Sequence, residues 1–302
     1  MTADRAPPPR DFMHLAARSN GPGLARLAFH LGLIGLSGWM VAMAPGLLVV
    51  PAVLLLAMAQ AALFAPMHET SHYTAFRTRW LNVGVGWAVG LPSLHNWHFY
   101  REFHLAHHKH TQVPGEDPEL DDPTPATLGG YLLRVGGVYF WRARLAVIAD
   151  AWTGRLAQRR YIHEAVAPRV IASVRASSAA VLMLAIAAGI AFGWQAVLLF
   201  WVLPQVAGQV LLRLYLLTEH TGCTLDRNGL TNTRTMMTNR AVRLLMWQMP
   251  FHAEHHLYPF IPFHRLAEAH EALKARLAHI GPGYAKWNAG FLRELKTRQS
   301  AG

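Results

Sequence analysis

Long stretches without charged residues divide this chain into apolar and polar segments. Residues 27–68 and residues 176–212 contain no Asp, Glu, Lys or Arg. A helix needs about 20 apolar residues to cross a bilayer, so each stretch is long enough for two membrane spans. Ala44-Pro45-Gly46 and Phe192-Gly193-Trp194 are turn signals that divide the two stretches, and Pro204 predicts a kink in the last span. The pattern therefore predicts four spans, at residues 27–43, 47–66, 177–193 and 195–213.

The positive charges indicate how these spans are oriented. Neither predicted turn carries a charge, whereas every Lys and Arg lies in residues 1–26, 67–175 or 213–302. Since Lys and Arg accumulate on the cytoplasmic side of membrane proteins, we expect all three segments and both termini there. The sequence thus predicts an all-α integral membrane protein, in which two transmembrane helical hairpins carry a cytoplasmic helical cap. In a bacterium it would lie in the inner membrane.

The tails and the region between the hairpins are less regular. We expect residues 1–26 to form a disordered or interfacial cytoplasmic tail, residues 27–280 the membrane domain, and residues 281–302 a second cytoplasmic tail. Residues 80–100 are apolar, but a fifth span there would separate the histidines on its two sides. We therefore predict a buried, re-entrant or interfacial segment. Residues 131–149 mix aromatic residues and arginines, which is typical of an amphipathic interfacial helix.

Composition supports a membrane protein and excludes several other classes. Hydrophobic residues make up 52% of the chain and charged residues 15%, against about 25% charged residues in a typical soluble domain. The single cysteine, Cys223, excludes an intrachain disulfide and a cysteine-rich zinc or iron–sulfur site. The formal net charge of +11 fits the cytoplasmic arginines and contact with anionic lipid or an acidic partner. We expect no nucleic acid partner.

Three histidine clusters border the predicted spans. They are His68-Glu69-Thr70-Ser71-His72, His104-Leu105-Ala106-His107-His108 and His252-Ala253-Glu254-His255-His256. Residues three or four apart lie on one face of a helix, so each cluster can present its imidazoles together. The second and third clusters share the spacing HxxHH, and each can point at one metal ion or straddle two. Pro250 and Pro259 limit the helix of the third cluster.

The eight clustered histidines are too many for one metal ion. Zinc takes four ligands in structural sites, and three plus water in catalytic sites, whereas a pair of redox metals can use eight or more. Imidazole suits iron, copper and zinc alike, so ligand type does not select the metal. His220, just past the fourth span, is a ninth candidate. The predicted metal ligands are His68, His72, His104, His107, His108, His220, His252, His255 and His256.

Carboxylates and one further histidine lie beside these ligands. Glu69 and Glu254 lie inside clusters, where a carboxylate can accept the free N–H of a ligand and fix its tautomer. The alternative for both is an ion pair with Arg101 or Arg243. The predicted orienting residues are Glu69, His110, Glu219 and Glu254.

The order HxxxH, HxxHH and HxxHH beside paired spans resembles the histidine boxes of the membrane fatty acid desaturase and hydroxylase superfamily. The resemblance covers residues 65–266. Residues 103–111, FHLAHHKHT, look like the second box of that family, and residues 251–259, FHAEHHLYP, look like the third. Residues 114–119, PGEDPE, are similar to the stretch after the second box in bacterial desaturase-like proteins, some carotenoid ketolases among them. His220 matches the place of an additional family histidine.

The resemblance implies a chemistry. It implies two iron ions, O₂ as co-substrate, and attack on an unactivated C–H bond of a lipid that enters from the bilayer. Desaturation of a fatty acyl chain is the first expectation. Hydroxylation or ketolation of a carotenoid, alkane or other apolar substrate is the alternative. A separate electron donor, such as ferredoxin or a cytochrome with its reductase, would dock on the arginine-rich face.

Two functions outside this superfamily remain open from the sequence. The first cluster also satisfies the HExxH pattern of zinc metalloproteases, with Glu69 as general base, but this interpretation leaves both HxxHH clusters unexplained. A metal transporter would line a path across the bilayer with histidines, whereas His30 is the one histidine well inside the predicted spans.

Overall fold

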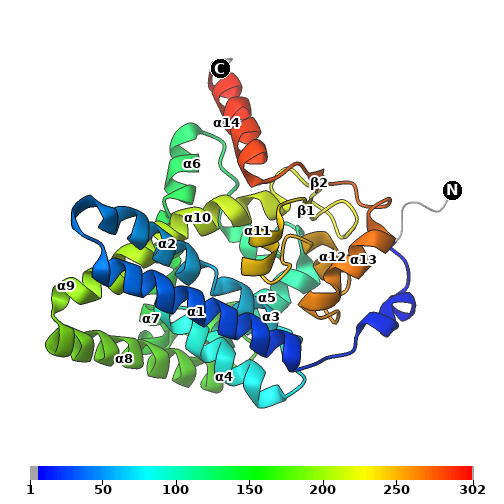
Figure 1. Ribbon diagram of the computed structural model, residues 1–302. Coiled ribbons are helices and arrows are strands. Elements are labelled where there is room, and N and C mark those ends of the chain that lie inside the picture. The colour runs from blue at the N-terminus through cyan, green and yellow to red at the C-terminus, as the bar shows by residue number, and fades with distance from the viewer. Residues whose placement is uncertain (1–5, 301–302) are drawn as a thin grey trace.

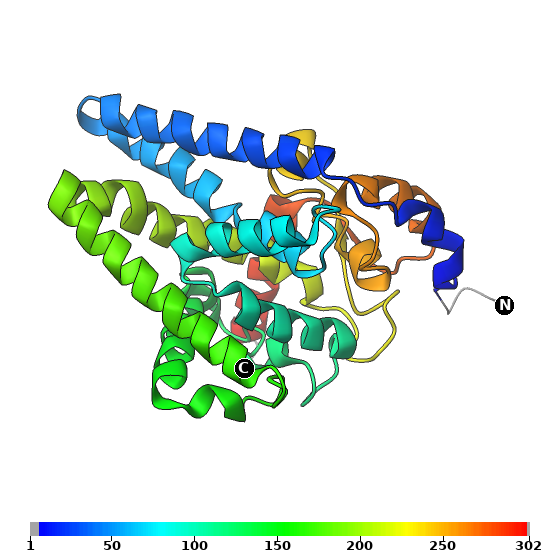
Figure 2. The same ribbon diagram turned by 90° about the horizontal axis from the view of Figure 1, so that it is seen from below.

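Two long helical hairpins extend from a helical cap, with their turns at the same end of the molecule (Figures 1 and 2). The structure is a computed structural model that describes residues 6–300. The first hairpin consists of α1 (Gly21–Met43), η2 (Gly46–Leu48), α2 (Val49–Ala61) and α3 (Phe64–Ser71). The second consists of α8 (Ala167–Phe192), α9 (Trp194–Val197), the π-helical turn η6 (Leu198–Val202) and α10 (Leu203–His220).

The four predicted spans are confirmed. Helices long and apolar enough to cross a membrane cover Gly21–Met43, Gly46–Ser71, Ala167–Phe192 and Trp194–His220. Each of these helices extends past the predicted span at the end that lies away from the hairpin turn. Such an extension is possible because helical hydrogen bonding does not require apolar side chains. These extensions carry His68 and His220 to the ends of membrane helices.

A polar contact inside the membrane region links the two hairpins at Pro204. Pro204 lacks a backbone N–H, so it cannot bond to the carbonyl of Phe200 four residues earlier. The chain forms a π-helical turn before the proline, and the Phe200 carbonyl accepts a hydrogen bond from Gln60 at 2.7 Å. Gln205 donates to the Gln60 side-chain oxygen at 2.9 Å. The irregularity expected at Pro204 is therefore a π-helical turn that binds α10 to α2.

The cap is built from the segments between and after the hairpins. Between them lie α4 (Arg79–Gly90), η3 (Leu91–Ser93), α5 (Trp97–His110), η4 (Pro118–Asp121), α6 (Leu128–Val135), α7 (Val138–Thr153) and η5 (Arg155–Gln158). After them lie β1 (Thr235–Met236), α11 (Arg240–Leu245), α12 (His252–Leu257), η7 (Phe263–Arg265), α13 (Leu266–Leu273), β2 (Ile280–Gly281) and α14 (Tyr284–Ser300). The two short strands pair in parallel, with Thr235 opposite Ile280. All other regular elements among residues 6–300 are helical, as predicted.

The apolar stretch at residues 80–100 folds back within the cap. It forms α4, which is 12 residues long, and the start of α5. Leu94, with a φ of 57°, reverses the chain between the two helices. Trp97 then donates from Nε1 to Thr70 Oγ1 of α3 at 3.1 Å. This arrangement agrees with the predicted buried segment and keeps α5 beside the first hairpin.

The helix predicted at residues 131–149 is interrupted. Gly137, with a φ of 77°, separates α6 from α7, and glycine adopts a positive φ without the steric cost that a side chain brings. α7 packs against α8 and buries Val147 and Ala151, while Leu145 is exposed. The prediction of one continuous helix is therefore wrong, and its amphipathic interfacial character stays a prediction.

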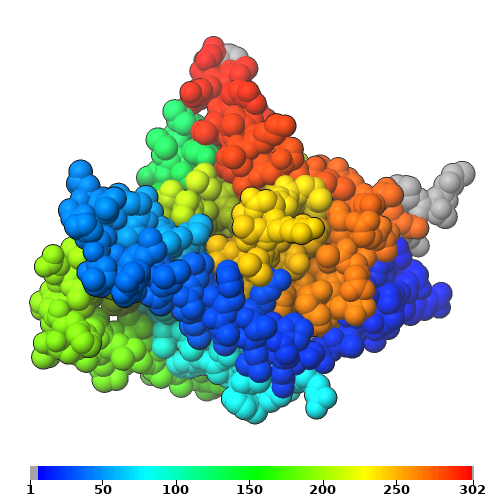
Figure 3. Space-filling model, viewed as in Figure 1, coloured from blue at the N-terminus to red at the C-terminus, as the bar shows by residue number. Residues whose placement is uncertain are grey.

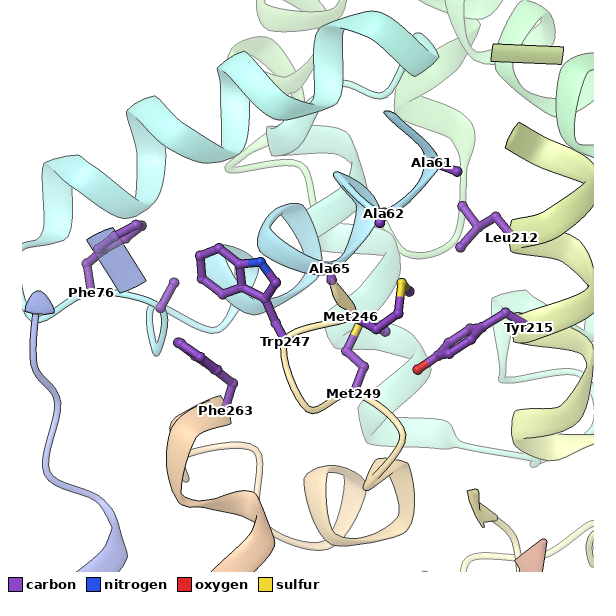
Figure 4. Packing of buried hydrophobic residues seen from close by; sticks show 11 residues of the cluster. Ala61, Ala62, Ala65, Phe76, Leu212, Tyr215, Met246, Trp247, Met249 and Phe263 are labelled. Carbon is purple, nitrogen blue, oxygen red and sulfur yellow. The ribbon is translucent and has the colours of Figure 1, made fainter. Parts of the chain in front are cut away.

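A buried apolar cluster joins the hairpins to the cap (Figure 4). Trp247 and Phe263 lie at its centre, with ring centroids 4.8 Å apart. At Gly208 of α10, nearby, a Cβ would lie 2.6 Å from the carbonyl oxygen of Ala57, so small residues are needed where α2 and α10 cross. The labelled members of the cluster are Ala61, Ala62, Ala65, Phe76, Leu212, Tyr215, Met246, Trp247, Met249 and Phe263.

Both predicted tails fold onto the cap within the described residues, so the disordered alternative for the N-terminal tail is wrong for them, and the interfacial alternative stays a prediction. The short helix η1 (Pro9–Leu15) buries Phe12 and Leu15, and Phe12 stacks on Tyr258 with ring centroids 4.4 Å apart. Figure 3 shows this N-terminal segment, in blue, against the orange part of the cap. In α14, Leu295 is fully buried. Burial of large apolar side chains offsets the entropy of ordering both segments.

Candidate metal centre

The histidine clusters lie on helices that meet at the base of the hairpins. α3 continues the first hairpin and carries His68, with His72 at its C-cap. Asn96 is the N-cap of α5, and its side chain accepts a hydrogen bond from the backbone N–H of Phe99 at 3.0 Å. α5 carries the second cluster. α10 ends at His220, and α12 carries the third cluster. Each cluster therefore lies on or at the end of a helix, as predicted.

The nine predicted ligands gather in two groups. In the first group, ring nitrogens of five histidines lie within 4.8 Å of one another: His68, His72, His104, His108 and His255. In the second group, ring nitrogens of His107, His220 and His256 also lie within 4.8 Å of one another. His252 joins the second group, because its Nε2 lies 3.3 Å from Nε2 of His220 and 3.1 Å from Nε2 of His256. The structure thus brings together all nine side chains.

Each HxxHH cluster contributes to both groups. In α5, His104 and His108 belong to the first group and His107 to the second. In α12, His255 belongs to the first group, while its neighbour His256 belongs to the second. Neighbouring helix residues point about 100° apart, so adjacent histidines reach different groups. The groups are contiguous, because the rings of His108 and His256 stack with centroids 4.1 Å apart.

The chemistry of this donor set fits two transition-metal ions. Both ring nitrogens of His68, His108 and His255 are buried with no hydrogen-bond partner among the described residues. Buried polar groups are rarely left in this state. Burial, reinforced by neighbouring histidines, lowers the pKa of His108 well below its usual value and that of His255 to about 3. These imidazoles are therefore neutral, as metal ligation requires.

Asp117 orients His107 and was not predicted. Its fully buried carboxylate accepts a hydrogen bond from His107 Nδ1 at 2.9 Å. The backbone N–H groups of Gln112 and Glu119 donate to the same carboxylate at 2.8 and 2.9 Å. Burial would raise the pKa of Asp117, but these hydrogen bonds outweigh it and lower that pKa. An ionised Asp117 therefore leaves Nε2 of His107 directed at the second group.

Three predicted orienting residues have other partners. Glu69 accepts a hydrogen bond at 3.0 Å from the first backbone N–H of η7. Glu254 accepts one from His270 Nδ1 at 2.5 Å, and His110 pairs with Glu116. In the described part of the chain none of the three bonds to a predicted ligand, and neither glutamate pairs with an arginine, so both interpretations of the glutamates are wrong. Successive helix residues point about 100° apart, and here Glu69 faces η7 and Glu254 faces α13.

Glu219, the fourth predicted orienting residue, lies at the edge of the second group. Its Oε2 is 3.5 Å from Nε2 of His252, and its Oε1 is buried without a hydrogen-bond partner among residues 6–300. Glu119 has a similar place, with Oε2 3.8 Å from Nε2 of His107. Both carboxylates lie beside the ring nitrogens that face the group, where they can balance the charge of a metal ion.

A cavity of about 360 Å³ opens beside the two groups. His68 and His104 of the first group and His107 and His252 of the second all line it. Tyr100 forms another part of its wall and stacks on His104 with ring centroids 5.2 Å apart. A substrate in this cavity would therefore contact both groups.

Two adjacent groups of histidines that could hold metal ions, beside helices long and apolar enough to cross a membrane, indicate an integral membrane metalloprotein. Comparison with known families identifies it further. The sequence profile of the fatty acid desaturase family matches residues 45–288. The chain belongs to this family, and it is therefore an oxidoreductase.

Three relatives carry desaturase names. The chain is 25% identical to an sn-1 oleoyl-lipid 12-desaturase of Picosynechococcus sp., and the alignment covers 78% of this chain and 72% of that one. It is 24% identical to an sn-1 oleoyl-lipid 12-desaturase of Anabaena variabilis, with 84% of this chain and 64% of that one covered. It is 29% identical to the dihydrorhizobitoxine desaturase of Bradyrhizobium elkanii, with 80% and 72% covered.

These findings confirm the predicted superfamily, the helical membrane architecture and the class of enzyme. The metalloprotease interpretation loses its general base, because Glu69 bonds to η7 instead of facing the histidines. The transporter interpretation required a path of histidines across the bilayer, whereas the nine histidines lie together at one end of the hairpins.

Proposed function

We propose that this protein is an O₂-dependent di-iron desaturase, which introduces a double bond into an aliphatic chain. The observation that carries the proposal is the division of nine clustered imidazoles into groups of five and four in a member of the fatty acid desaturase family. A single zinc ion has no redox chemistry and takes at most a few of these ligands. Two irons in adjacent sites use all of them.

The two groups suggest which residues hold which metal. His68, His72, His104, His108 and His255 would hold one iron, and His107, His220, His252 and His256 the other. When bound, the two irons supply O₂ activation and hydrogen removal from an unactivated C–H bond. The chain contributes burial, which keeps water from the ring nitrogens, and Asp117, which fixes the orientation of His107.

The reaction requires electrons from outside the protein. Desaturation takes two hydrogens from the substrate and reduces O₂ to two waters, so two more electrons and two protons must enter in each cycle. We expect a separate donor such as ferredoxin or a cytochrome with its reductase, docked on the arginine-rich cap. The distribution of Lys and Arg supports a cap and both termini in the cytoplasm, and in a bacterium a location in the inner membrane.

The names of the relatives bear on the substrate and on the outcome of the reaction. The two oleoyl-lipid desaturases support a fatty acyl chain, which is also the first expectation from the sequence. The name of the dihydrorhizobitoxine desaturase supports desaturation but mentions no lipid. All three names favour loss of hydrogen over the alternatives of hydroxylation and ketolation.

Mass spectrometry of cells with and without the protein tests this proposal. We expect a lipid or metabolite that is lighter than its precursor by two hydrogen atoms, forms only when O₂ is supplied, and contains no oxygen from isotopically labelled O₂. Cells that carry the His255→Ala variant serve as the inactive control. A product heavier by one labelled oxygen atom would contradict desaturation.

A further inference from the structure

The cavity beside the histidines is more polar than an acyl chain requires. A tunnel for an acyl chain is expected to be apolar, because charges removed from water need partners. This cavity is lined by nine charged side chains: Arg134, Arg142, Arg144, Arg159, Arg213, Glu119, Asp121, Asp122 and Glu219.

Most of these charged side chains are paired with an opposite charge, exposed, or next to the proposed metal ligands. Three ion pairs account for several of them: Arg134 with Asp122 at 3.6 Å, Arg159 with Asp150 at 2.7 Å, and Arg160 with Asp121 at 2.8 Å. Arg142 is exposed and lies over the ring of Tyr139. Glu119 and Glu219 lie beside His107 and His252, where metal ions would balance them.

Arg144 of α7 and Arg213 of α10 are the exceptions. Their guanidinium carbons lie 5.7 and 4.8 Å from the centroid of the same ring, that of Phe140. Nε of each is buried without a hydrogen-bond partner, and neither side chain forms an ion pair within residues 6–300. Burial lowers the pKa of Arg144 to about 10, which leaves it charged at neutral pH. In the described part of the chain, two cations thus share one wall of the cavity, and neither has a carboxylate within ion-pair distance, although Glu119 and Glu219 lie near enough to interact with Arg213.

We propose that Arg144 and Arg213 bind the carboxylate of a compact organic acid, and that the desaturated carbons lie within a few bonds of this carboxylate. The planar guanidinium group matches a carboxylate with two parallel hydrogen bonds. The arginines and both histidine groups line one cavity of about 360 Å³, near the lower end of the roughly 300–1,000 Å³ of ligand pockets. This inference rests on the desaturase function proposed above and names its substrate class.

The packing next to the cavity favours a compact substrate over a long acyl chain. An apolar groove of about 490 Å³ lies in the membrane region beside α8 and η6. Between groove and cavity, the side chains of Leu91, His95, Val147 and Val181 leave a void of about 10 Å³, which is too small to hold more than one water. A chain that reached from the groove to the histidines would displace these side chains, whereas a compact acid needs the cavity alone.

Calorimetric binding to the iron-loaded protein in lipid nanodiscs, without reductant, tests this inference. The probes are hexanoate, the amino acid norleucine, methyl hexanoate, hexan-1-ol and oleate. We expect saturable binding of hexanoate or norleucine, and binding about tenfold or more weaker for the ester and the alcohol. Loss of one charged hydrogen-bonding partner should weaken acid binding about 10- to 100-fold in Arg144→Gln and in Arg213→Gln. Arg240→Gln, which removes an exposed arginine outside the cavity, should bind as the unmodified protein does.

Several results would overturn the inference. Equal binding of hexanoate and methyl hexanoate would do so without any variant, so the test survives if the arginine variants fail to fold. Unchanged acid binding in both variants would show that the arginines do not hold the carboxylate. Oleate binding at least as tight as that of both compact acids would contradict a compact substrate.

The binding test is separate from the proposed function, because it requires no turnover. A protein that binds compact acids through its arginines but never forms a double bond would refute the desaturase proposal alone. Desaturation of a neutral acyl lipid at the same rate in Arg144→Gln would refute the carboxylate site alone.

Discussion

Replacement of Asp117 by Asn perturbs the second histidine group through one side chain. The carboxylate oxygens of Asp117 lie 2.9 and 3.1 Å from Nδ1 of His107. They also accept hydrogen bonds from the backbone N–H groups of Gln112 at 2.8 Å and Glu119 at 2.9 Å. Asparagine has nearly the same shape but only one acceptor oxygen. Its amide N–H₂ would face one of these donors, so at least one buried N–H group loses its acceptor.

The expected size of the effect follows from these contacts. A buried donor without an acceptor costs about 1–3 kcal/mol. Loss of a partner that orients a metal-bound histidine typically lowers metal affinity about 10- to 100-fold, which corresponds to about 1.4–2.7 kcal/mol. Asp117 bonds to His107 of the second group and to no histidine of the first. The loss should therefore affect one iron.

Iron retention against a chelator measures this loss in purified protein. We expect Asp117→Asn to release one of its two irons at a chelator concentration about 10- to 100-fold lower than the unmodified protein does, and the other iron at an unchanged concentration. Glu164→Gln, which removes an exposed carboxylate, is the matched control. Equal release of both irons, or release identical to that of the unmodified protein, would refute the assignment of Asp117 to the second group.

Three further predictions test the site and its support. His108→Ala should remove the iron of the first group and His256→Ala that of the second, leaving about one iron per chain by elemental analysis; loss of both irons in each variant would contradict separate sites. Gly208→Val would press a Cβ against the Ala57 carbonyl and should lower the free energy of unfolding by about 1–3 kcal/mol; an unchanged Tm in nanodiscs would contradict the close helix crossing. Phe12→Ala should cost about 3–5 kcal/mol and expose the N-terminal segment to protease, whereas unchanged cleavage would contradict its docking on the cap.

The membrane architecture and the ligand set could be predicted because both are local in sequence. The length of a charge-free run alone decides whether it can hold two membrane helices, and the stretch around Pro45 predicts the turn between them. Spacings of three and four residues are sufficient to place His104 and His108 on one face of a helix. The division of His255 and His256 between two groups was one of two alternatives, and the ring contacts of α12 with His108 of α5 were needed to decide it.

The contacts that were not predicted join segments through tertiary packing. Asp117 reaches His107 because the loop after α5 turns back, and no spacing rule identifies that return. From the sequence, Arg144 was one of several arginines on a predicted interfacial helix, and Arg213 was the last residue of a predicted span. Arg144 lies one helical turn after Phe140 in α7, whereas Arg213 reaches the same ring from α10, far along the chain. The docked tails were missed for the same reason, since burial of a short apolar segment depends on a distant surface.

Metal analysis of the purified protein decides whether these histidines hold two irons. The protein would be reconstituted with iron in nanodiscs and examined by elemental analysis and Mössbauer spectroscopy. We predict two irons per chain, both in histidine-rich environments, with one iron lost selectively in Asp117→Asn. A single iron per chain, or one tightly bound zinc that iron does not displace, would contradict the di-iron assignment.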